Sequence, residues 1–237
     1  MPHISIFGDS LSTYGGLILP PGANAYLEAS YILDNGNGNV LTAISSAYPS
    51  YTINNISRGG MTTDEALTGV QTYVGPGLPN PFGSHVTITG YLSNVRPNIA
   101  VVRYGVADAI LMNNANATLN NINTIVNHAK SLNVEVILIG CNPIVEATSA
   151  AYAGPLPAVS TATVTVNDAI QANLHLKAIN DNIKFINPRH ANIMDLVFPD
   201  GVHPFNTYGK VITEEISFQA QSLTRFGRRS NVRITQQ

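Results

Sequence analysis

The stretch His3-Ile4-Ser5-Ile6-Phe7-Gly8-Asp9-Ser10-Leu11 decides the fold. Its first part, His3–Phe7, is short and apolar, which is typical of a buried strand in a parallel sheet. Ser10 follows almost directly, so we expect its hydroxyl at the carboxyl edge of a sheet, where ligands approach open α/β sheets. The stretch therefore predicts the first strand of an α/β domain with a serine just past its end.

Further apolar runs indicate the rest of this sheet. The additional strands are expected at Thr52–Ile56, Ile99–Tyr104, Glu135–Gly140 and Lys184–Asn187. Segments with helical periodicity surround them: Leu41–Tyr48, Thr63–Tyr73, Thr118–Leu132, Thr163–Ile179 and Thr207–Leu223. Strands that alternate with helices predict a doubly wound, mostly parallel sheet.

We expect one domain over residues 1–237, because no repeat or linker demands a second. Three long segments fit the series of strands and helices poorly and are interpreted as loop insertions: 17–39, 74–86 and 147–162. Each lies beside a strand end, so they either shape a ligand cleft or are ordinary surface loops. Clustered arginines indicate a basic, solvated tail over 225–237.

Composition excludes several classes of protein. The chain is 44% hydrophobic and 11% charged with a formal charge of -2, so it can bury a sizeable core but lacks a surface that tracks phosphates. Nucleic acid is therefore not an expected partner. Arg103 interrupts the best candidate for a membrane span, and no signal-peptide pattern precedes the first strand. We expect a soluble protein; export and virion association both stay open, as does the oligomeric state.

The histidines and the single cysteine predict no cofactor. Cys141 ends an apolar run and is interpreted as a small buried hydrophobe. Four of the histidines are scattered without the spacing of metal ligands: His85, His128, His175 and His190. Neither a metal nor another cofactor is expected.

A possible partner for Ser10 stands near the other end of the chain. The segment Asp200-Gly201-Val202-His203 places a carboxylate three residues before an imidazole. If the carboxylate accepts Nδ1–H of His203, Nε2 is left to take the proton of Ser10, whose hydroxyl is a weak nucleophile without a base. Alone, the segment could equally be a capping aspartate beside a surface histidine. Together with the Ser10 stretch it favours a nucleophilic serine site.

These segments resemble the SGNH (GDSL-type) hydrolase family of serine esterases, lipases and carbohydrate deacetylases. Gly8–Leu11 resembles its first block, Asn54–Thr63 its second and Asp200–His203 its last, in the family's order. The resemblance implies a three-layer α/β/α sandwich with a five-stranded parallel sheet. It also implies Ser10 as nucleophile and oxyanion donor, Gly60 as a second oxyanion donor, and Asp200 and His203 as the triad partners.

The third block departs from the family pattern. Gly-x-Asn-Asp is expected, but the chain has Gly105-Val106-Ala107-Asp108, so Ala107 occupies the position of an oxyanion-hole asparagine. A methyl group donates no hydrogen bond, and turnover is expected to be weakened. Asn113 and Asn114 follow closely and are either substitutes for that donor or turn formers.

The leading hypothesis is a serine esterase that forms an acyl-Ser10 intermediate. A weakly charged, amide-rich composition suits a short acyl group on a sugar better than a long lipid chain, so the expected partner is a small acyl ester or an acetylated polysaccharide. The preferred form is a polysaccharide O-deacetylase on a phage tail or an exported protein. The alternatives are a carbohydrate-binding module with this fold, which Ala107 motivates, and an acyltransferase that uses the same acyl-enzyme.

Overall fold

The computed structural model describes residues 1–12, 40–72, 80–146, 158–189, 202 and 206–229. Five parallel strands form one sheet: β1 (His3–Gly8), β2 (Thr52–Asn55), β3 (Ile99–Arg103), β4 (Glu135–Ile139) and β5 (Lys184–Ile186). Their order is β2-β1-β3-β4-β5, so the chain winds to one side of β1 first and then to the other. The predicted doubly wound sheet is confirmed.

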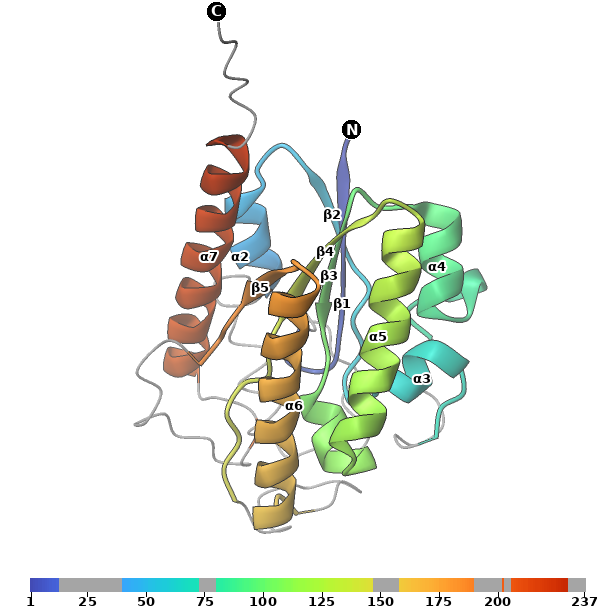
Figure 1. Cartoon of the computed structure of the whole chain (residues 1–237), viewed down its shortest axis with the longest axis vertical. Coiled ribbons are helices and arrows are strands. Elements are labelled where there is room, and N and C mark those ends of the chain that lie inside the picture. The colour runs from blue at the N-terminus through green and yellow to red at the C-terminus, as the bar shows by residue number, and fades with distance from the viewer. Residues whose placement is uncertain (13–39, 73–79, 147–157, 190–201, 203–205, 230–237) are drawn as a thin grey trace, which may run out of the picture.

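Helices cover both faces of the sheet (Figure 1). One face carries α2 (Val40–Ala47) and α7 (Asn206–Arg229). The other carries α3 (Thr63–Thr68), α4 (Ile88–Val95), α5 (Ala115–Ser131) and α6 (Thr161–Asn180). The three-layer α/β/α arrangement is therefore confirmed. Within the described residues, no helix combines the length and apolar character that crossing a membrane requires.

The alternation of side chains along each strand divides the core in two. In β1, Ile4 and Ile6 pack toward α2 and α7, whereas Phe7 packs toward the helices of the opposite layer. In β3, Val101 and Val102 divide in the same way. Because both faces are covered, these strands contain apolar residues at nearly every position, which is typical of buried parallel strands. This explains why β1 and β3 are recognisable from sequence as continuous apolar runs.

Several helix boundaries differ from those expected. The helix predicted over Thr63–Tyr73 ends at Thr68, because Gly69 adopts a left-handed conformation (φ 73°) and its N–H closes on the carbonyl of Glu65. An additional helix, α4, follows Thr87, whose hydroxyl accepts from the N–H of Gly90. The sequence prediction missed this helix, which is 8 residues long.

The loop and tail segments are also corrected in part. Within 74–86, residues 83–85 form a short 3-10 turn, η1 (Gly83–His85). The loop predicted near 147–162 extends slightly too far, because Ser160 caps α6 and the helix begins at Thr161. Residues 225–229, expected in the basic tail, continue α7, consistent with the good helix propensity of arginine. Residues 17–39, 73–79, 147–157 and 230–237 lie outside the described residues.

Replacing Gly105 tests how tightly the segment after β3 packs against α6. Its φ is 131°, and an added Cβ would contact Sγ of Cys141 and lie 2.9 Å from Cγ2 of Ile170. We expect Gly105→Ala to lower the free energy of unfolding by about 2–5 kcal/mol, because backbone strain and overlap add. Urea unfolding followed by circular dichroism measures this loss.

Gly83→Ala is the matched control for Gly105→Ala. Gly83 also has a positive φ, 55°, but an added Cβ would meet no atom within 4 Å. Its expected cost is about 1–2 kcal/mol, from the left-handed conformation alone. Equal losses in the two variants would contradict the tight packing inferred at Gly105.

Candidate active site

Three of the residues implicated by sequence lie at the carboxyl edge of adjacent strands. Ser10 follows β1 in a turn, Gly60 lies in a turn after β2, and Ala107 follows β3. Since β1 lies between β2 and β3, these turns are neighbours at the point where the winding of the sheet reverses. Open α/β sheets bind ligands outside the carboxyl ends of their strands at such a point. The arrangement therefore suits a ligand site.

The predicted acid and base cannot be placed in this arrangement. Asp200 and His203 lie outside the described residues. Val202, which stands directly before His203 in the chain, is 1% exposed and belongs to the core cluster on the α3–α6 side of the sheet. The roles of Asp200 and His203 stay predictions.

The carboxylate of Asp9 joins the Ser10 turn to the Ala107 loop. Asp9 is 2% exposed, its Oδ1 accepts from the N–H of Leu11 at 3.1 Å, and its Oδ2 accepts from the N–H of Ala107 at 3.2 Å. The carbonyl of Asp9 accepts from the N–H of Ser12 at 3.0 Å. Hydrogen bonds of a buried carboxylate are strong, so the two loops hold each other in place.

The turn that contains Gly60 is held by a buried ion pair. Met61 N–H donates to the carbonyl of Arg58 at 3.2 Å, and Gly60 between them has a φ of 66°. Arg58 donates to Glu65 at 2.7 Å, and both side chains are buried. Glu65 also accepts from the N–H of Thr62 in the capping box that begins α3. A rigid turn results.

The main-chain N–H of Gly60 has no internal acceptor in the part of the chain that the structure describes. No hydrogen bond engages it there, although the surrounding turn is tightly bonded. Gly60 is itself only partly buried. An N–H held in a rigid turn and left without an internal acceptor has the geometry of a donor for an anion.

Ala107 offers neither of its own groups as such a donor. Its methyl group donates nothing, and its N–H is engaged by Asp9. The neighbouring amides do not replace it in the described structure: Asn114 caps α5 by accepting from the N–H of Ala117, and Asn113 adopts a left-handed conformation at the end of the π-helical turn η2 (Asp108–Met112). Asn113 and Asn114 therefore act as turn and capping residues.

Asp108 connects the Ala107 loop to α3. Its Oδ1 accepts from the N–H and the hydroxyl of Thr63 and from the hydroxyl of Thr118 at 3.4 Å. Asn121 donates to the Thr63 hydroxyl at 3.1 Å and extends the network into α5. The carboxyl is fully buried and its Oδ2 has no hydrogen-bond partner. Burial raises the pKa of Asp108 from 3.8 to about 7, although the Thr63 hydrogen bonds oppose that rise.

Cys141 is a core residue. Its side chain is 2% exposed, and burial raises the pKa of the thiol far above its ordinary value. The thiol contacts the carbonyl of Tyr104 at 3.7 Å. A buried, protonated thiol is a poor nucleophile, so the structural interpretation of Cys141 agrees with its surroundings.

Sequence reasoning missed the charged residues that support these loops. Arg58, Glu65 and Arg103 are each at most 6% exposed. From the sequence, Glu65 was expected only to support the first turn of a helix, and no site role was assigned to Arg58 or Arg103. A signal was present, because only 11% of the chain is charged and these residues lie within or beside the segments that resemble the family blocks. Lys, Glu, Arg and Asp are almost never fully buried unless paired, so pairing at the carboxyl edge could have been suspected.

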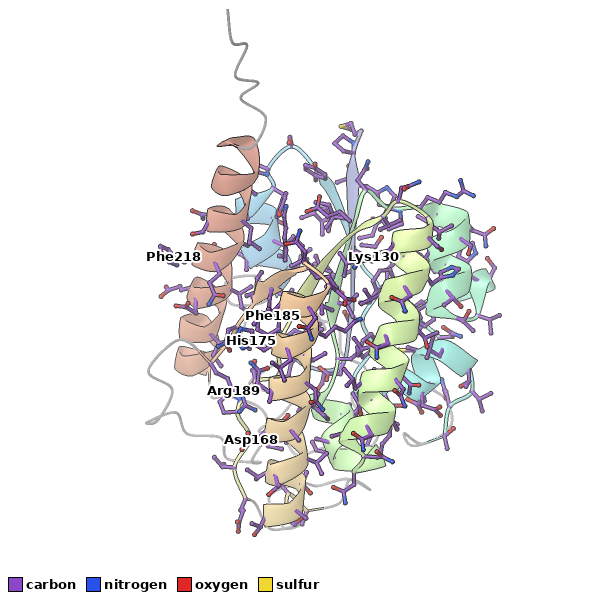
Figure 2. The ribbon with its side chains drawn as sticks, in the orientation of Figure 1. Lys130, Asp168, His175, Phe185, Arg189 and Phe218 are labelled. Atoms are coloured by element: carbon purple, nitrogen blue, oxygen red, sulfur yellow. The ribbon has the colours of Figure 1, made fainter. Side chains whose placement is uncertain are left out.

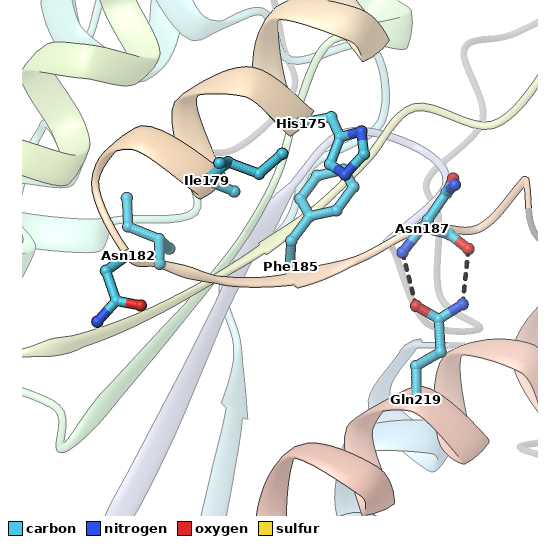
Figure 3. Close-up of a pocket in the computed structure, with 8 residues that line it drawn as sticks. His175, Ile179, Asn182, Phe185, Asn187 and Gln219 are labelled. Carbon is cyan, nitrogen blue, oxygen red and sulfur yellow. Dashed lines mark hydrogen bonds between the residues drawn. The ribbon is translucent and has the colours of Figure 1, made fainter.

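The groove shown in Figure 3 lies elsewhere on the molecule. It has a volume of about 360 Å³ and lies between α6, β5 and α7. His175 stacks on Phe185 there with ring centroids 5.1 Å apart, and Gln219 pairs with the backbone of Asn187. Among the described residues, none of the Ser10, Gly60 or Ala107 turns lines the groove, so it is separate from these three turns. Among the described residues no cluster of histidine, cysteine or acidic side chains could hold a metal ion.

No protein-family model matches the sequence, and no curated protein matches it. Solved structures do match. A carbohydrate acetylesterase family member from Sinorhizobium meliloti has a TM-score of 0.62 at 14% identity, over 95% of this chain and 98% of its own.

Two other solved structures give the same result. A GDSL-like lipase from Bacteroides thetaiotaomicron has a TM-score of 0.58 at 15% identity, over 94% of this chain and 88% of its own. A psychrotrophic esterase from Pseudoalteromonas sp., in a form inhibited by monoethylphosphonate, has a TM-score of 0.56 at 16% identity, over 95% and 100%. At these identities the likeness shows a common fold that extends over nearly the whole chain.

The raised pKa of Asp108 predicts a pH-dependent stability. The native carboxyl keeps its proton up to about pH 7, whereas the unfolded one releases it near pH 4. The native state therefore binds more protons between these values, and the free energy of unfolding should fall as pH rises from 4 through 7, by on the order of 4 kcal/mol. Urea titrations across this range measure the slope.

Asp108→Asn isolates the contribution of this one group. The amide keeps an oxygen that can accept from Thr63 but cannot ionise. The difference in stability between the variant and the parent protein should change steadily between pH 4 and 7. A constant difference over that interval would show that Asp108 ionises normally in the folded protein.

Proposed function

We propose that the protein is a serine esterase in which Ser10 is the nucleophile and Asp200 and His203 complete the triad. The observation that carries the proposal is the Asp9 carboxylate, which ties the Ser10 turn to the Ala107 loop at the same sheet edge as the Gly60 turn. The fold shared with esterases over nearly the whole chain supports it. Because one fold can host many functions, the residues of the site carry the proposal.

The first half of the proposed reaction forms an acyl-enzyme. His203 accepts the proton of the Ser10 hydroxyl through Nε2 while the oxygen attacks the ester carbonyl carbon, and Asp200 stabilises the resulting imidazolium. The carbonyl oxygen becomes an oxyanion, which the N–H groups of Ser10 and Gly60 stabilise. The tetrahedral intermediate then expels the alcohol, which takes the proton from His203.

The second half releases the acid and restores the enzyme. Water attacks the acyl-Ser10 carbonyl, and His203 takes one of its protons. The same N–H groups stabilise the second oxyanion, after which Ser10 leaves with the proton of the imidazolium. No cofactor takes part in either step.

The proposed substrate is a short acyl ester, preferably an acetyl group on a polysaccharide. The weakly charged, amide-rich composition favours a sugar over a long lipid chain. The structural similarity to a carbohydrate acetylesterase family member is consistent with this choice. A place on a phage tail or in an exported protein belongs to the same proposal.

Ala107 favours a second candidate function, a carbohydrate-binding module that turns its ligand over negligibly. The engaged N–H and the methyl group of Ala107 leave the oxyanion hole with fewer donors than the family pattern has. Release of a chromogenic alcohol from an acetyl ester, compared with a Ser10→Ala variant, separates the two. Serine-dependent release supports an esterase, and no release in either protein supports a binding module. Transfer to a sugar hydroxyl in place of water would identify an acyltransferase.

We expect an organophosphonate to add its mass to Ser10 of the parent protein. His203→Ala should slow this labelling by roughly 10²–10⁴-fold, because the hydroxyl loses its base. Intact-mass and peptide mass spectrometry follow the rate and the position. His175→Ala, an exposed histidine in the separate groove, is the matched control and should label at the parental rate. Unchanged labelling of His203→Ala would rule out His203 as the base.

We expect Ala107→Asn to raise turnover by about 10–10³-fold. The added amide acts mainly on the transition state, so kcat should rise while KM changes little. Ala107→Leu is the control, because leucine is similar in size to asparagine but has no hydrogen-bond donor. It should give no gain in turnover. Steady-state kinetics on a chromogenic acetyl ester measure both variants. A folded Ala107→Asn protein with parental kcat would place the position outside the oxyanion hole and favour the binding module.

A further inference from the structure

Arg103 makes contacts that reach the Ser10 turn from the adjacent strand. It is the last residue of β3 and is paired in register with Gly8 at the end of β1. The guanidinium is buried, with a residue exposure of 5%. Its Nη1 donates to the carbonyl of Leu11, the residue that follows Ser10, and its Nη2 donates to Oδ1 of Asn142 at 2.8 Å.

Asn142 is in turn fixed to the α6 layer. It is 1% exposed and follows the end of β4 after two residues. Its carbonyl accepts from Nδ2 of Asn167 at 2.9 Å, and Asn167 is a fully buried residue of α6. A continuous set of hydrogen bonds therefore runs from α6 through Asn142 and Arg103 to the main chain beside Ser10.

We propose that Arg103 is a positioning residue for Ser10. This inference rests on the proposed esterase function. Asp9 accepts from the N–H groups of Leu11 and Ser12, whereas Arg103 donates to the Leu11 carbonyl, on the other side of the Leu11–Ser12 peptide unit. Held from both sides, the turn keeps the Ser10 oxygen in one position for attack. Positioning of this kind lowers the activation barrier without adding a contact to the substrate.

The bridge from Arg103 to Leu11 and Asn142 requires the guanidinium group of an arginine. A guanidinium presents several N–H donors in a fixed plane, so it can bridge two acceptors on different loops, whereas an ammonium is a single point charge on a flexible chain. Arg103→Lys thus keeps the positive charge beside the site and removes the bridge. The substitution separates positioning from a simple electrostatic effect of the charge.

Arg189 provides a matched control from the same region. It donates to Oδ1 of Asp168 at 2.6 Å, to the carbonyl of Cys141 at 2.9 Å and to the carbonyl of Asn142 at 3.3 Å. Figure 2 shows Arg189 next to Asp168 of α6. Arg189 therefore also contacts Asn142, at its carbonyl, but within the described residues none of its hydrogen bonds reaches the Ser10 turn.

The test compares Arg103→Lys, Asn142→Ala, the double variant and Arg189→Lys, each confirmed as folded by circular dichroism. With an acetyl ester, Arg103→Lys should lower kcat by roughly 10–100-fold with KM nearly unchanged. Asn142→Ala should have a smaller effect of the same kind. The double variant should lose less than the product of the two, because both changes break one bridge. Arg189→Lys should retain parental kcat.

Amide hydrogen exchange gives a second readout that needs no activity. Exchange at Leu11 and Ser12 should accelerate in Arg103→Lys and stay parental in Arg189→Lys. Parental exchange and kcat in Arg103→Lys would overturn the proposal, as would equal losses of kcat in Arg103→Lys and Arg189→Lys. A parent protein that a phosphonate does not label at Ser10 would overturn the esterase proposal and the catalytic purpose of Arg103 with it. Accelerated exchange would then still show that Arg103 holds the turn.

Discussion

The candidate site depends on one buried carboxylate, that of Asp9. Its two oxygens accept main-chain N–H groups from different loops, one beside Ser10 and one at Ala107. A carboxylate with 2% exposure is costly to bury unless its oxygens are satisfied, so any displacement of either loop carries an electrostatic penalty. The relative position of the first and third loops is therefore determined by the need to satisfy this charge.

Other buried polar groups at the same edge follow the same logic. Glu65 is satisfied by Arg58 and by the capping box of α3, which shapes the turn of Gly60. Asp108 accepts from Thr63, which anchors the loop of Ala107 to the start of that helix. Each carboxyl group joins segments that are distant in sequence, and each is buried where water could not replace a lost partner. Rigidity of this kind suits a site whose donors must be positioned before the ligand arrives.

Ala107 is connected to the Ser10 turn through its main chain alone. The N–H of Ala107 is directed to Asp9, so the loop keeps its connection to the Ser10 turn although the side chain contributes no donor. The framework of the site and its donor set are thus separable. The contacts around Asp9, Glu65 and Asp108 would be the same in a weakened esterase and in a binding module. The two differ only in turnover.

The sequence by itself determined the strands, their parallel arrangement and the place of Ser10 just past the first strand. Buried strands are continuous apolar runs, and Gly8–Leu11 adjoins the first of them. The resemblance to the SGNH family predicted roles for Gly60 and the departure at Ala107. Helix ends such as Gly69 and the short helix α4 were beyond the sequence, since they depend on local backbone conformation and packing. Only the tertiary structure decided which charged residues support the site. Asp9 contacts Ala107 and Arg103 contacts Leu11 across more than 90 positions of sequence. These contacts are strong because both are buried at the same edge of the sheet, where the dielectric is low, and no local sequence pattern encodes that burial.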